Sequence, residues 1–523
     1  MKIFRITNHL VLAASLLCLF ACSQTAGVHE EAPVQDHWRK LIILHTNDIH
    51  GQVLPLPATW LKDREPVPDT GGVERLAAYV KKVRAQAERD GHEVLVVDAG
   101  DWFQGTPEGG IEDGLPFLEI LGEVGYDAMA VGNHEFDHGV QILEDHLSVL
   151  EIPALLANTS EPSGSFLKGT QPYLIVERAG LRIALVGLLT VDTPSITHHS
   201  ASTLFWADPA KVLISLTEDL KDDVDWVLPL THMGFRGDQE LVAQVPGIPL
   251  VIGGHSHTLL AQGSKQGDTW IVQAGSKARG VGRVEVWVDP QTRTLERIVP
   301  AVVNLYKETA EGFSNPKVAE LTRELLQRSE QRMNVVVGHL NADLKRGKAP
   351  RQTSNAGNWV TDVMRSQTQA DVALQNRGGL RSNLVAGPIT RRDVFRMLPF
   401  NNTVIVLTMK GTELESLMRR TIESENGATL EMSGMQVGAK QNGSAWQMTQ
   451  LLIGGQPIEP ERAYRVATNS YLAGGGDGFK EFTFVRERTK EGPVQRDVIE
   501  VMFVAAESGI TPPDDNRYLI EFE

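Results

Sequence analysis

The sequence contains very little cysteine. Cys18 and Cys22 are its only two cysteines in 523 residues, and both lie near the N-terminus. From residue 23 onward the chain offers no thiol, which excludes an internal disulfide, thiolate metal ligands and a cysteine nucleophile there. A metal site or a catalytic site in this part must therefore use nitrogen and oxygen groups.

Basic runs and long apolar runs are also missing. The formal net charge is -16 at pH 7 and the pI is about 5.5. Lys and Arg do not cluster, and binding to a phosphate backbone needs clustered cations, so the composition argues against a nucleic-acid polymer as a partner. After residue 22 no segment is long and apolar enough to span a bilayer, and no repeat of fixed period is visible. This composition favours an exported globular protein.

Residues 1–22 have the pattern of an export signal. Lys2 and Arg5 precede a short apolar stretch, Leu10–Phe20, and a small residue follows before Cys22. A basic start and a short apolar core are typical of a signal peptide and not of a membrane span.

The end of this segment, Leu19-Phe20-Ala21-Cys22, resembles a bacterial lipobox, in which the cysteine is acylated and becomes the first residue. The alternative is an ordinary cleaved signal with a stray cysteine. In such lipoproteins Ser23 after the cysteine implies sorting to the outer membrane. We therefore expect a periplasmic or cell-envelope protein, attached to the membrane by a lipid at Cys22, with residues 23–39 as a flexible tether.

Beyond residue 39 roughly 485 residues remain, too many for one hydrophobic core and suited to two large domains. Residues 40–312 alternate strand-like runs with helical patterns, which is typical of a layered α/β fold. In Gly72–Asp90 apolar side chains recur at helical spacing, and Gly91 can cap the helix. Gly282–Asp289 alternates like a half-exposed strand, and we expect Thr292–Val299 to be its hairpin partner.

A linker helix is expected at residues 313–333. Asn315 can act as the N-cap, and Pro316 suits the first helical position. The apolar side chains that follow mark one face of the helix: Val318, Leu321, Leu325 and Leu326. This pattern predicts an amphipathic helix that joins the first domain to a second domain at 334–523, and a hinge at this helix is its functional interpretation.

Five apolar runs in the first domain each end in a cluster of polar side chains. The runs, each with the polar segment after it, are Leu41–Leu44 before His45–Gly51, Val94–Val97 before Asp98–Asp101, Tyr126–Val131 before Gly132–Asp137, Trp226–Leu230 before Thr231–Gly234, and Leu250–Ile252 before Gly253–Thr258. Side chains that gather beyond strand ends suit an α/β fold with a site at that edge. Five repetitions argue against coincidence.

The segment Gly132–Asp137 is at the centre of this pattern. The run before it is typical of a buried strand, so Asn133 and His134 lie where the strand stops. Asp137 is within reach of His134, where a carboxylate can set the tautomer of the imidazole or stabilise its charged form. On its own the segment fits a polar turn equally well, and the four similar segments favour a site.

The clustered side chains supply imidazole nitrogens and carboxylate or amide oxygens. They are more than one ion needs and enough for two ions that share one carboxylate: Asp48, His50, Asp101, Asn133, His232, His255 and His257. Paired divalent ions about 3.5–4 Å apart can hold the attacking and leaving oxygens of a phosphoryl transfer and lower the pKa of a bound water. This ligand mixture suits Mn, Zn, Fe or Co, and it matches Ca poorly because Ca prefers oxygen ligands.

These blocks resemble the five signature motifs of the calcineurin-like metallophosphoesterases. They are Asp48-Ile49-His50-Gly51, Gly100-Asp101, Gly132-Asn133-His134-Glu135, Thr231-His232 and Gly253-Gly254-His255-Ser256-His257. The resemblance implies a four-layer α/β sandwich with a bridging Asp101. One ion would be held by Asp48, His50, Asp101 and His257, and the other by Asp101, Asn133, His232 and His255.

The same resemblance implies a catalytic role for His134, oriented by Asp137. His134 would stabilise charge on the phosphoryl group or aid the leaving oxygen. His257 stands where many relatives carry Gln or Asn. Imidazole is an adequate ligand at that place, although the metal preference could shift.

Segments of the second domain combine glycine with aromatic or charged side chains. Asn376–Ser382 is a glycine-rich turn in which Arg381 offers a planar fork for phosphate or carboxylate. Phe400 lies in an otherwise polar turn, and Tyr471 precedes a glycine run that contains Asp477. This set suits a stacked nucleobase with its sugar bonded below. The alternative is a set of loops whose aromatic side chains serve packing only.

In this order after a metallophosphoesterase domain, the segments resemble the C-terminal domain of the 5′-nucleotidase family, over nearly the whole chain after residue 39. That family includes periplasmic UDP-sugar hydrolases and animal ecto-5′-nucleotidases. The resemblance implies a second α/β (α+β) domain that binds the substrate and rotates to carry it to the metals. Phe400 and Tyr471 would sandwich the base, Asp477 would hold ribose hydroxyls, and Asn376 and Arg381 would contact the nucleotide.

Three positions of the second domain depart from the family pattern. Tyr471 replaces the more usual Phe, which should preserve stacking and add a hydroxyl. The segment Asn376-Arg377-Gly378 stands where Asn-Gly-Gly is common in relatives, so Arg377 would be an extra cation near the phosphates. Pro350 occupies a place where relatives carry an arginine, with Arg351 one residue away, which leaves the role of Arg351 open.

The function that this resemblance implies is an exported, two-metal phosphohydrolase that removes phosphate from nucleoside 5′-monophosphates and can extend to nucleotide diphosphate sugars. One alternative is a 2′,3′-cyclic-nucleotide 2′-phosphodiesterase/3′-nucleotidase, which typically has Asn in place of Asp137. A thiosulfate-ester hydrolase of the same scaffold would not need two base-stacking aromatics. A non-catalytic nucleotide-binding lipoprotein is a further alternative, against which the complete ligand set speaks.

Overall fold

The computed structural model describes residues 35, 37–347, 349–424, 430–485, 487–489 and 492–521. The predicted signal peptide (1–22), the acylated Cys22 and most of the predicted tether therefore lie outside the described residues. None of the helices within the described ranges is long and apolar enough to cross a membrane.

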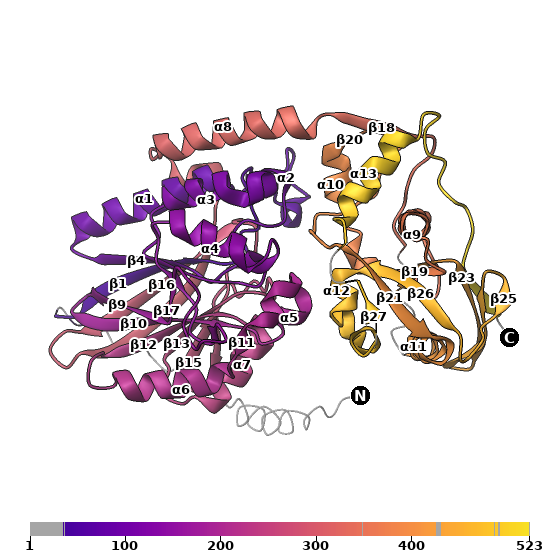
Figure 1. The fold of residues 1–523 in the computed structure, drawn as a ribbon. Helices are drawn as coiled ribbons and strands as arrows, with labels where there is room; N and C mark the ends of the chain where they lie inside the picture. Colours follow the sequence, from indigo (N-terminus) through magenta and orange to yellow (C-terminus); the bar gives the residue numbers. More distant parts are fainter. Residues whose placement is uncertain are drawn as a thin grey trace, which may run out of the picture. The chain divides into compact units, whose positions relative to one another are not determined.

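The first domain is built on two β-sheets (Figure 1). One has the strand order β17 (Thr294–Asn304), β16 (Gly280–Asp289), β1 (Arg39–Thr46), β4 (Glu93–Asp98), β5 (Ala128–Ala130), β6 (Ala154–Leu155) and β8 (Thr170–Gln171). The other has the order β14 (Ser264–Gln266), β15 (Thr269–Val272), β13 (Leu250–Gly253), β12 (Trp226–His232), β10 (Leu181–Leu189) and β9 (Tyr173–Arg178). The central strands β1, β4 and β5 are parallel to one another, as are β10, β12 and β13.

Alternate side chains of the same strand enter different cores, which produces the layers. Leu41 and Ile43 of β1 join the core between the two sheets, whereas Ile42 and Leu44 join the core on the outer face. Successive side chains of a strand point to opposite faces, so a sheet covered on both faces is apolar throughout.

Helices cover the outer face of each sheet (Figure 1). On the first sheet they are α1 (Val73–Asp90), α3 (Leu115–Gly122) and α4 (Val140–Val149), and on the second they are α6 (Pro209–Leu220) and α7 (Gly234–Gln244). The predicted four-layer α/β sandwich is therefore confirmed.

Several local predictions are confirmed as well. Helix α1 ends at Gly91, whose backbone is left-handed with φ 70°. Strand β17 pairs antiparallel with β16, as expected for the hairpin partner, but it continues to Asn304.

The predicted linker helix is α8 (Pro316–Met333). Asn315 is its N-cap, and the Asn315 side chain accepts hydrogen bonds from the N–H groups of Lys317 and Val318. Val318 and Leu325 are buried in the core of the first domain on its outer face, with Leu321 and Leu326 packed against it.

The second domain contains a mixed sheet in the order β22 (Leu430–Ser433), β19 (Val372–Asn376), β26 (Ala463–Asn469), β21 (Val404–Lys410) and β27 (Glu487–Arg488). A further sheet has the order β25 (Gln456–Pro457), β24 (Ala445–Ile453), β23 (Met435–Asn442) and β28 (Tyr518–Glu521). Smaller strands β18 (Val336–Leu340) and β20 (Gly387–Thr390) form an antiparallel pair. The helices of this domain are α9 (Asn355–Thr368), α10 (Arg391–Met397), α11 (Gly411–Glu423), α12 (Ser470–Ala473) and α13 (Gln495–Ala505). This mixture agrees with the predicted second α/β (α+β) domain.

Candidate functional site

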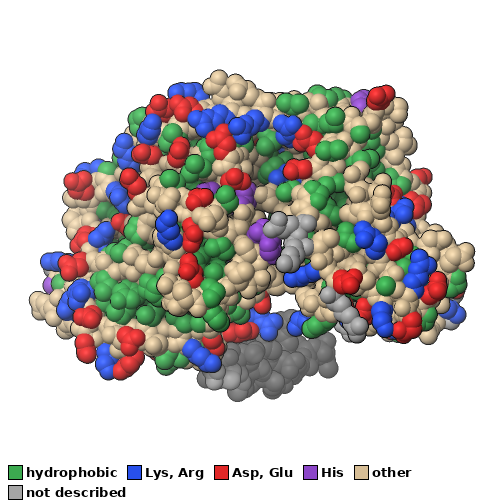
Figure 2. All heavy atoms as spheres, in the orientation of Figure 1, with side chains coloured by type: hydrophobic (Ala, Val, Ile, Leu, Met, Phe, Trp, Pro, Cys, Tyr) green, Lys and Arg blue, Asp and Glu red, His purple; other side chains and the backbone are tan. Residues whose placement is uncertain are grey.

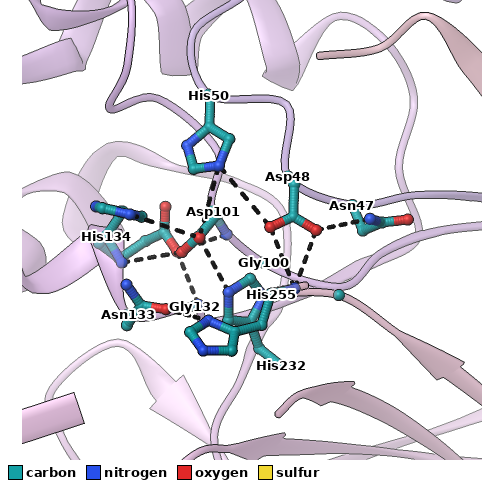
Figure 3. Close-up of polar contacts among 12 residues, drawn as sticks. Asn47, Asp48, His50, Gly100, Asp101, Gly132, Asn133, His134, His232 and His255 are labelled. Atoms are coloured by element: carbon teal, nitrogen blue, oxygen red, sulfur yellow. Dashed lines mark hydrogen bonds and ion pairs between the residues drawn. The ribbon is translucent and has the colours of Figure 1, made fainter. Parts of the chain in front are cut away.

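The predicted metal ligands lie together at the C-terminal ends of the parallel strands, and Figure 3 labels all of them except His257. Asp48 and His50 follow β1, Asp101 follows β4, and Asn133 follows β5. His232 is the last residue of β12, and His255 and His257 follow β13. The parallel direction of these strands brings their C-terminal ends to one edge of the sandwich, where a site is expected.

The ligand atoms are in direct contact with one another. Nε2 of His232 lies 3.0 Å from Oδ2 of Asp101, and Nδ1 of His255 lies 2.8 Å from Oδ1 of Asn133. Nε2 of His257 lies 2.9 Å from Nε2 of His50.

Two groups of these atoms are compact enough to hold an ion each. Asp48, His50 and His257 form one, and Asp101, His232 and His255 form the other. Nε2 of His50 is 3.8 Å from carboxylate oxygens of both Asp48 and Asp101, so the two groups are adjacent.

Backbone carbonyls fix the tautomers of two of the imidazoles. Nδ1 of His232 is 2.7 Å from the carbonyl oxygen of Ala99, and Nδ1 of His50 is 2.7 Å from that of Gln104. A carbonyl only accepts, so each Nδ1 carries the hydrogen and each neutral ring presents a lone pair at Nε2. Imidazole lone pairs then face carboxylate oxygens, an arrangement that fits a divalent cation between them.

The field of the buried carboxylates also favours a cation. Burial disfavours the charged form of His232, but the charges of Asp101 and Asp48 outweigh it and raise the pKa of His232 to about 10. Burial acts to raise the pKa of Asp101, and the charges of His232 and His134 hold it well below its usual range. The site therefore requires positive charge beside Asp101, which a metal ion supplies as well as a proton does.

The backbone at the site is held in an unusual conformation. Asp48, His50, Asp101, His255 and His257 all have positive φ, between 52° and 76°. Residues other than glycine adopt this left-handed region rarely, at a cost of order 1–3 kcal/mol each, and such strain clusters at functional sites.

Sequence reasoning missed two side chains that hold these loops. Glu135 is fully buried and accepts hydrogen bonds from the N–H groups of Asp101, Trp102 and Gly132, at 2.6 to 2.9 Å. Asn47 donates to Oδ2 of Asp48 and accepts from the N–H of Ala274. Both lie in polar segments that follow apolar runs in the sequence, but only the fold shows which N–H groups hydrogen-bond to them.

His134 and Asp137 form the expected pair. Nδ1 of His134 lies 2.6 Å from Oδ2 of Asp137, and Nε2 of His134 lies 4.0 Å from Oδ2 of Asp101. Burial acts to lower the pKa of His134, but the charges of Asp137 and Asp101 outweigh it and raise that pKa to about 10. The carboxylates of Asp137 and Asp101 therefore favour the charged form of the His134 imidazole.

A cavity of about 340 Å³ connects this pair to the predicted nucleotide-binding residues. Its lining includes Asn133, His134, Asp137, His255, Asn376, Arg381, Phe400, Tyr471 and Asp477. Residues of both domains thus border one space, which brings candidate ligands of the first domain together with the aromatic side chains of the second. On the face shown in Figure 2, basic and acidic side chains are interspersed among the described residues and form no continuous basic patch.

The second-domain residues in this cavity contact one another. The carboxylate of Asp477 accepts hydrogen bonds from the Tyr471 hydroxyl at 2.7 Å and from Nδ2 of Asn376 at 3.0 Å. The guanidinium of Arg381 lies 5.8 Å from the ring centre of Phe400. The ring of Phe400 is nearly parallel to that of His134, with the centres 6.2 Å apart.

Arg377 does not lie where the sequence placed it. It is absent from the cavity lining, and its guanidinium pairs with the buried Glu431 at 3.2 Å and donates to the carbonyls of Ala349 and Gln352. The expectation of an extra cation near the phosphates is therefore wrong, because the buried carboxylate attracts the guanidinium. Arg351 donates to the carbonyls of Ile422 and Ser424 and likewise lies outside the cavity lining.

The fold consists of two paired sheets with helices on both outer faces, and its candidate nitrogen and oxygen ligands lie at the ends of the parallel strands. This combination of fold and site defines the class of a metallophosphoesterase. Residues 41–259 match the calcineurin-like phosphoesterase family, and residues 336–483 match the 5′-nucleotidase C-terminal domain. The chain therefore belongs to the 5′-nucleotidase family and is a metal-dependent enzyme, as the sequence motifs predicted.

Similar proteins match this chain over most of its length. The protein UshA of Yersinia enterocolitica is 28% identical over 515 residues, which cover 89% of this chain and 91% of that protein. A 5′-nucleotidase of Vibrio cholerae is 27% identical, over 99% of this chain and 98% of its own. The crystal structure of a 5′-nucleotidase precursor from Thermus thermophilus superimposes with a TM-score of 0.72 at 28% identity, over 92% of this chain and 99% of that one.

Proposed function

We propose that this enzyme removes phosphate from nucleoside 5′-monophosphates with two divalent metal ions as cofactors. The observation that carries the proposal is the shared cavity, in which His134 and Asp137 border the same space as Phe400, Tyr471 and Asp477. In this space a nucleotide would place its phosphate beside the ligand cluster and its base against the aromatic side chains. The name of similar proteins, 5′-nucleotidase, supports the same substrate class.

Asp101 would be shared by both ions. Asp48, His50 and His257 would complete the set around one ion, and Asn133, His232 and His255 the set around the other: seven protein ligands, all nitrogen or oxygen. When bound, the ions would hold the phosphate oxygens and provide hydroxide near neutral pH. Mn, Zn, Co and Fe all suit this donor set.

His134, held by Asp137, would act on the phosphate ester. Its Nδ1–H donates to Asp137, so its Nε2 is left to face the cavity and the oxygen of Asp101. A protonated Nε2 can donate to a phosphoryl oxygen or to the leaving oxygen of the nucleoside. Asp137 holds the imidazole in this orientation and stabilises its charge.

The second domain would select the nucleoside. Phe400 and Tyr471 would sandwich the base, and the Tyr471 hydroxyl and Asn376 hold Asp477 in place for the ribose hydroxyls. Each oxygen of Asp477 keeps a lone pair for a further donor. Arg381 would contact the nucleotide beside Phe400.

A second candidate substrate is a nucleotide diphosphate sugar, which the resemblance to a family that includes UDP-sugar hydrolases favours. A 2′,3′-cyclic-nucleotide phosphodiesterase is less well supported because Asp137 carries a carboxylate bonded to His134. A binding protein without catalysis is not favoured either, since the ligand cluster is complete.

The test is a substrate panel on metal-reconstituted protein. Phosphate release would be measured with AMP, UDP-glucose, 2′,3′-cyclic AMP and bis(p-nitrophenyl) phosphate, with and without added Mn²⁺. We expect AMP to have the highest kcat/KM, only in the presence of metal. Faster turnover of the cyclic nucleotide would overturn the proposal, as would tight AMP binding without hydrolysis under every metal.

We also propose that the enzyme is exported and anchored to the outer membrane through Cys22. The support is the lipobox-like sequence Leu19-Phe20-Ala21-Cys22 with Ser23 after it. Mass spectrometry of the N-terminal peptide should find a diacylglyceryl group on Cys22. An N-terminus at another residue, with no lipid, would contradict this.

A further inference from the structure

The Asp137 carboxylate is bonded at both of its oxygens. Oδ2 lies 2.6 Å from Nδ1 of His134, and Oδ1 accepts a hydrogen bond from the Thr197 hydroxyl at 2.8 Å. Thr197 stands 60 residues further along the chain, in the segment after α5 (Thr193–Ile196), and it borders the same cavity.

The second bond matters because the last torsion of an aspartate is soft. Rotation about this sp³–sp² bond has broad minima, so one hydrogen bond leaves the plane of the carboxylate free to tilt. A donor on the other oxygen fixes that plane. The direction in which Oδ2 meets His134 therefore depends on the Thr197 hydroxyl.

Thr197 is itself held in place. Its backbone is extended, with φ -138° and ψ -164°, and a β-branched side chain has few rotamers there. Before it, the Thr193 hydroxyl donates to the carbonyl of Thr190. After it, the Ser200 hydroxyl accepts from the N–H of Val140, which follows Asp137 closely in the chain. Donor and acceptor are thus fixed relative to each other from both sides.

We propose that Thr197 is a positioning residue for the His134–Asp137 pair. The inference rests on the proposed function, in which that pair acts on the phosphate ester. Thr197 acts through Asp137 and not on the ester itself. It keeps Oδ2 in line with Nδ1–H, and so keeps Nε2 of His134 aimed into the cavity.

The first test compares three single variants. Thr197→Val keeps the shape and removes the hydroxyl, and we expect it to lower kcat about tenfold with little change in KM. Thr197→Ser retains a hydroxyl and should recover most of the loss. Thr203→Val is the matched control, because its exposed hydroxyl donates to the carbonyl of Ser200 outside the cavity lining, and it should behave as wild type.

The second test is a double-mutant cycle with Asp137→Ala. If Thr197 acts through Asp137, then Thr197→Val should have no further effect once the carboxylate is gone. An equal tenfold loss in both backgrounds would mean that Thr197 shapes the loop only, and would overturn the inference.

The choice of substrates separates this inference from the proposed function. Each variant would be assayed with AMP and with bis(p-nitrophenyl) phosphate. Normal AMP turnover by Thr197→Val overturns the role of Thr197 and leaves the function intact. A wild type that cleaves only the nitrophenyl ester, with the Thr197→Val loss still present, overturns the nucleotide specificity and supports the inference. A wild type that cleaves no ester overturns both.

Discussion

Nε2 of His232 faces Oδ2 of Asp101 at 3.0 Å, and both side chains are almost completely buried. The other nitrogen of the ring is bonded to the carbonyl of Ala99, so the neutral imidazole presents a lone pair to the carboxylate. No donor among the described residues satisfies this Nε2. Two buried acceptors at this distance require a positive charge between them, and a metal ion meets that need without a proton.

The first prediction concerns this pair. Asp101→Ala should reduce turnover of AMP to the detection limit, because Asp101 is the carboxylate that both ligand groups would share. Chelation of wild type should abolish activity and lower the Tm, since an ion that binds only the folded state stabilises it. Added Mn²⁺ should restore both properties in wild type and neither in Asp101→Ala.

The matched control is Asp145→Ala, which removes an exposed aspartate on α4. It should retain wild-type activity and the metal-dependent shift of Tm. Wild-type rates for Asp101→Ala at saturating metal would show that the two-metal assignment is wrong.

The second prediction separates substrate binding from chemistry. Phe400→Ala should raise KM for AMP about tenfold or more with a small change in kcat, because stacking of a base on an aromatic ring contributes about 1–3 kcal/mol. Where substrate dissociates faster than it reacts, RT times the logarithm of the KM ratio between variant and wild type gives this energy.

Two further variants check that interpretation. Phe400→Trp keeps a stacking surface and should retain a low KM. Phe484→Ala removes an aromatic side chain that is 78% exposed and absent from the cavity lining, so its KM should not change. A fall in kcat without a change of KM in Phe400→Ala would place Phe400 with His134 in the chemical step.

The strands and the ligand cluster were predictable because the sheets are buried on both faces. Such strands are apolar along their whole length, so β1, β4, β10, β12 and β13 are visible as continuous runs. The ligands directly follow these runs in the sequence. The end of β17 was less visible: Pro300 interrupts the pattern, but an edge strand tolerates proline, and β17 is at the edge of its sheet.

Contacts between distant segments could not be predicted in the same way. Thr197 and Asp137 are 60 residues apart, and Arg377 and Glu431 are 54 residues apart. Nothing in local spacing shows that Glu431 is buried or that its partner is Arg377, whose place beside Asn376 suggested a phosphate contact instead. These pairings depend on which buried group needs a partner, and that is a property of the tertiary fold.

The third prediction tests the structural role of Arg377. Glu431 is fully buried and accepts hydrogen bonds from Arg377 and from the N–H and hydroxyl of Ser354. Removal of one partner from a buried ion pair leaves an uncompensated charge, so Arg377→Ala should cost about 3–5 kcal/mol of stability. Chemical denaturation measures this loss, and KM of the folded enzyme should stay unchanged.

Arg419→Ala provides the comparison, because Arg419 forms half-exposed ion pairs with Glu415 and Glu423 on α11. Surface pairs contribute about 1 kcal/mol or less. An Arg377→Ala enzyme of normal stability with a raised KM would instead support a contact between Arg377 and the phosphates.

The fourth prediction is a pH dependence of stability that originates at His146 on α4. His146 is buried against the ring of Phe103, and burial, with a smaller effect from the charge of His138, lowers the pKa of His146 to about 4. The unfolded chain has the ordinary value of about 6.5, so between pH 6.5 and pH 4 the unfolded state binds a proton that the native state does not. The free energy of unfolding should therefore fall as the pH falls through this window, and His146 should have no such effect above pH 6.5.

His146→Leu removes the titrating group and should lose less stability than wild type between pH 7.5 and pH 5, measured by urea denaturation at both values. Val149→Leu, an exposed change on the same helix, reports the contribution of all other groups. If His146→Leu and Val149→Leu lose stability equally over this interval, His146 takes up its proton in the native state as readily as in the unfolded chain, and the prediction is wrong.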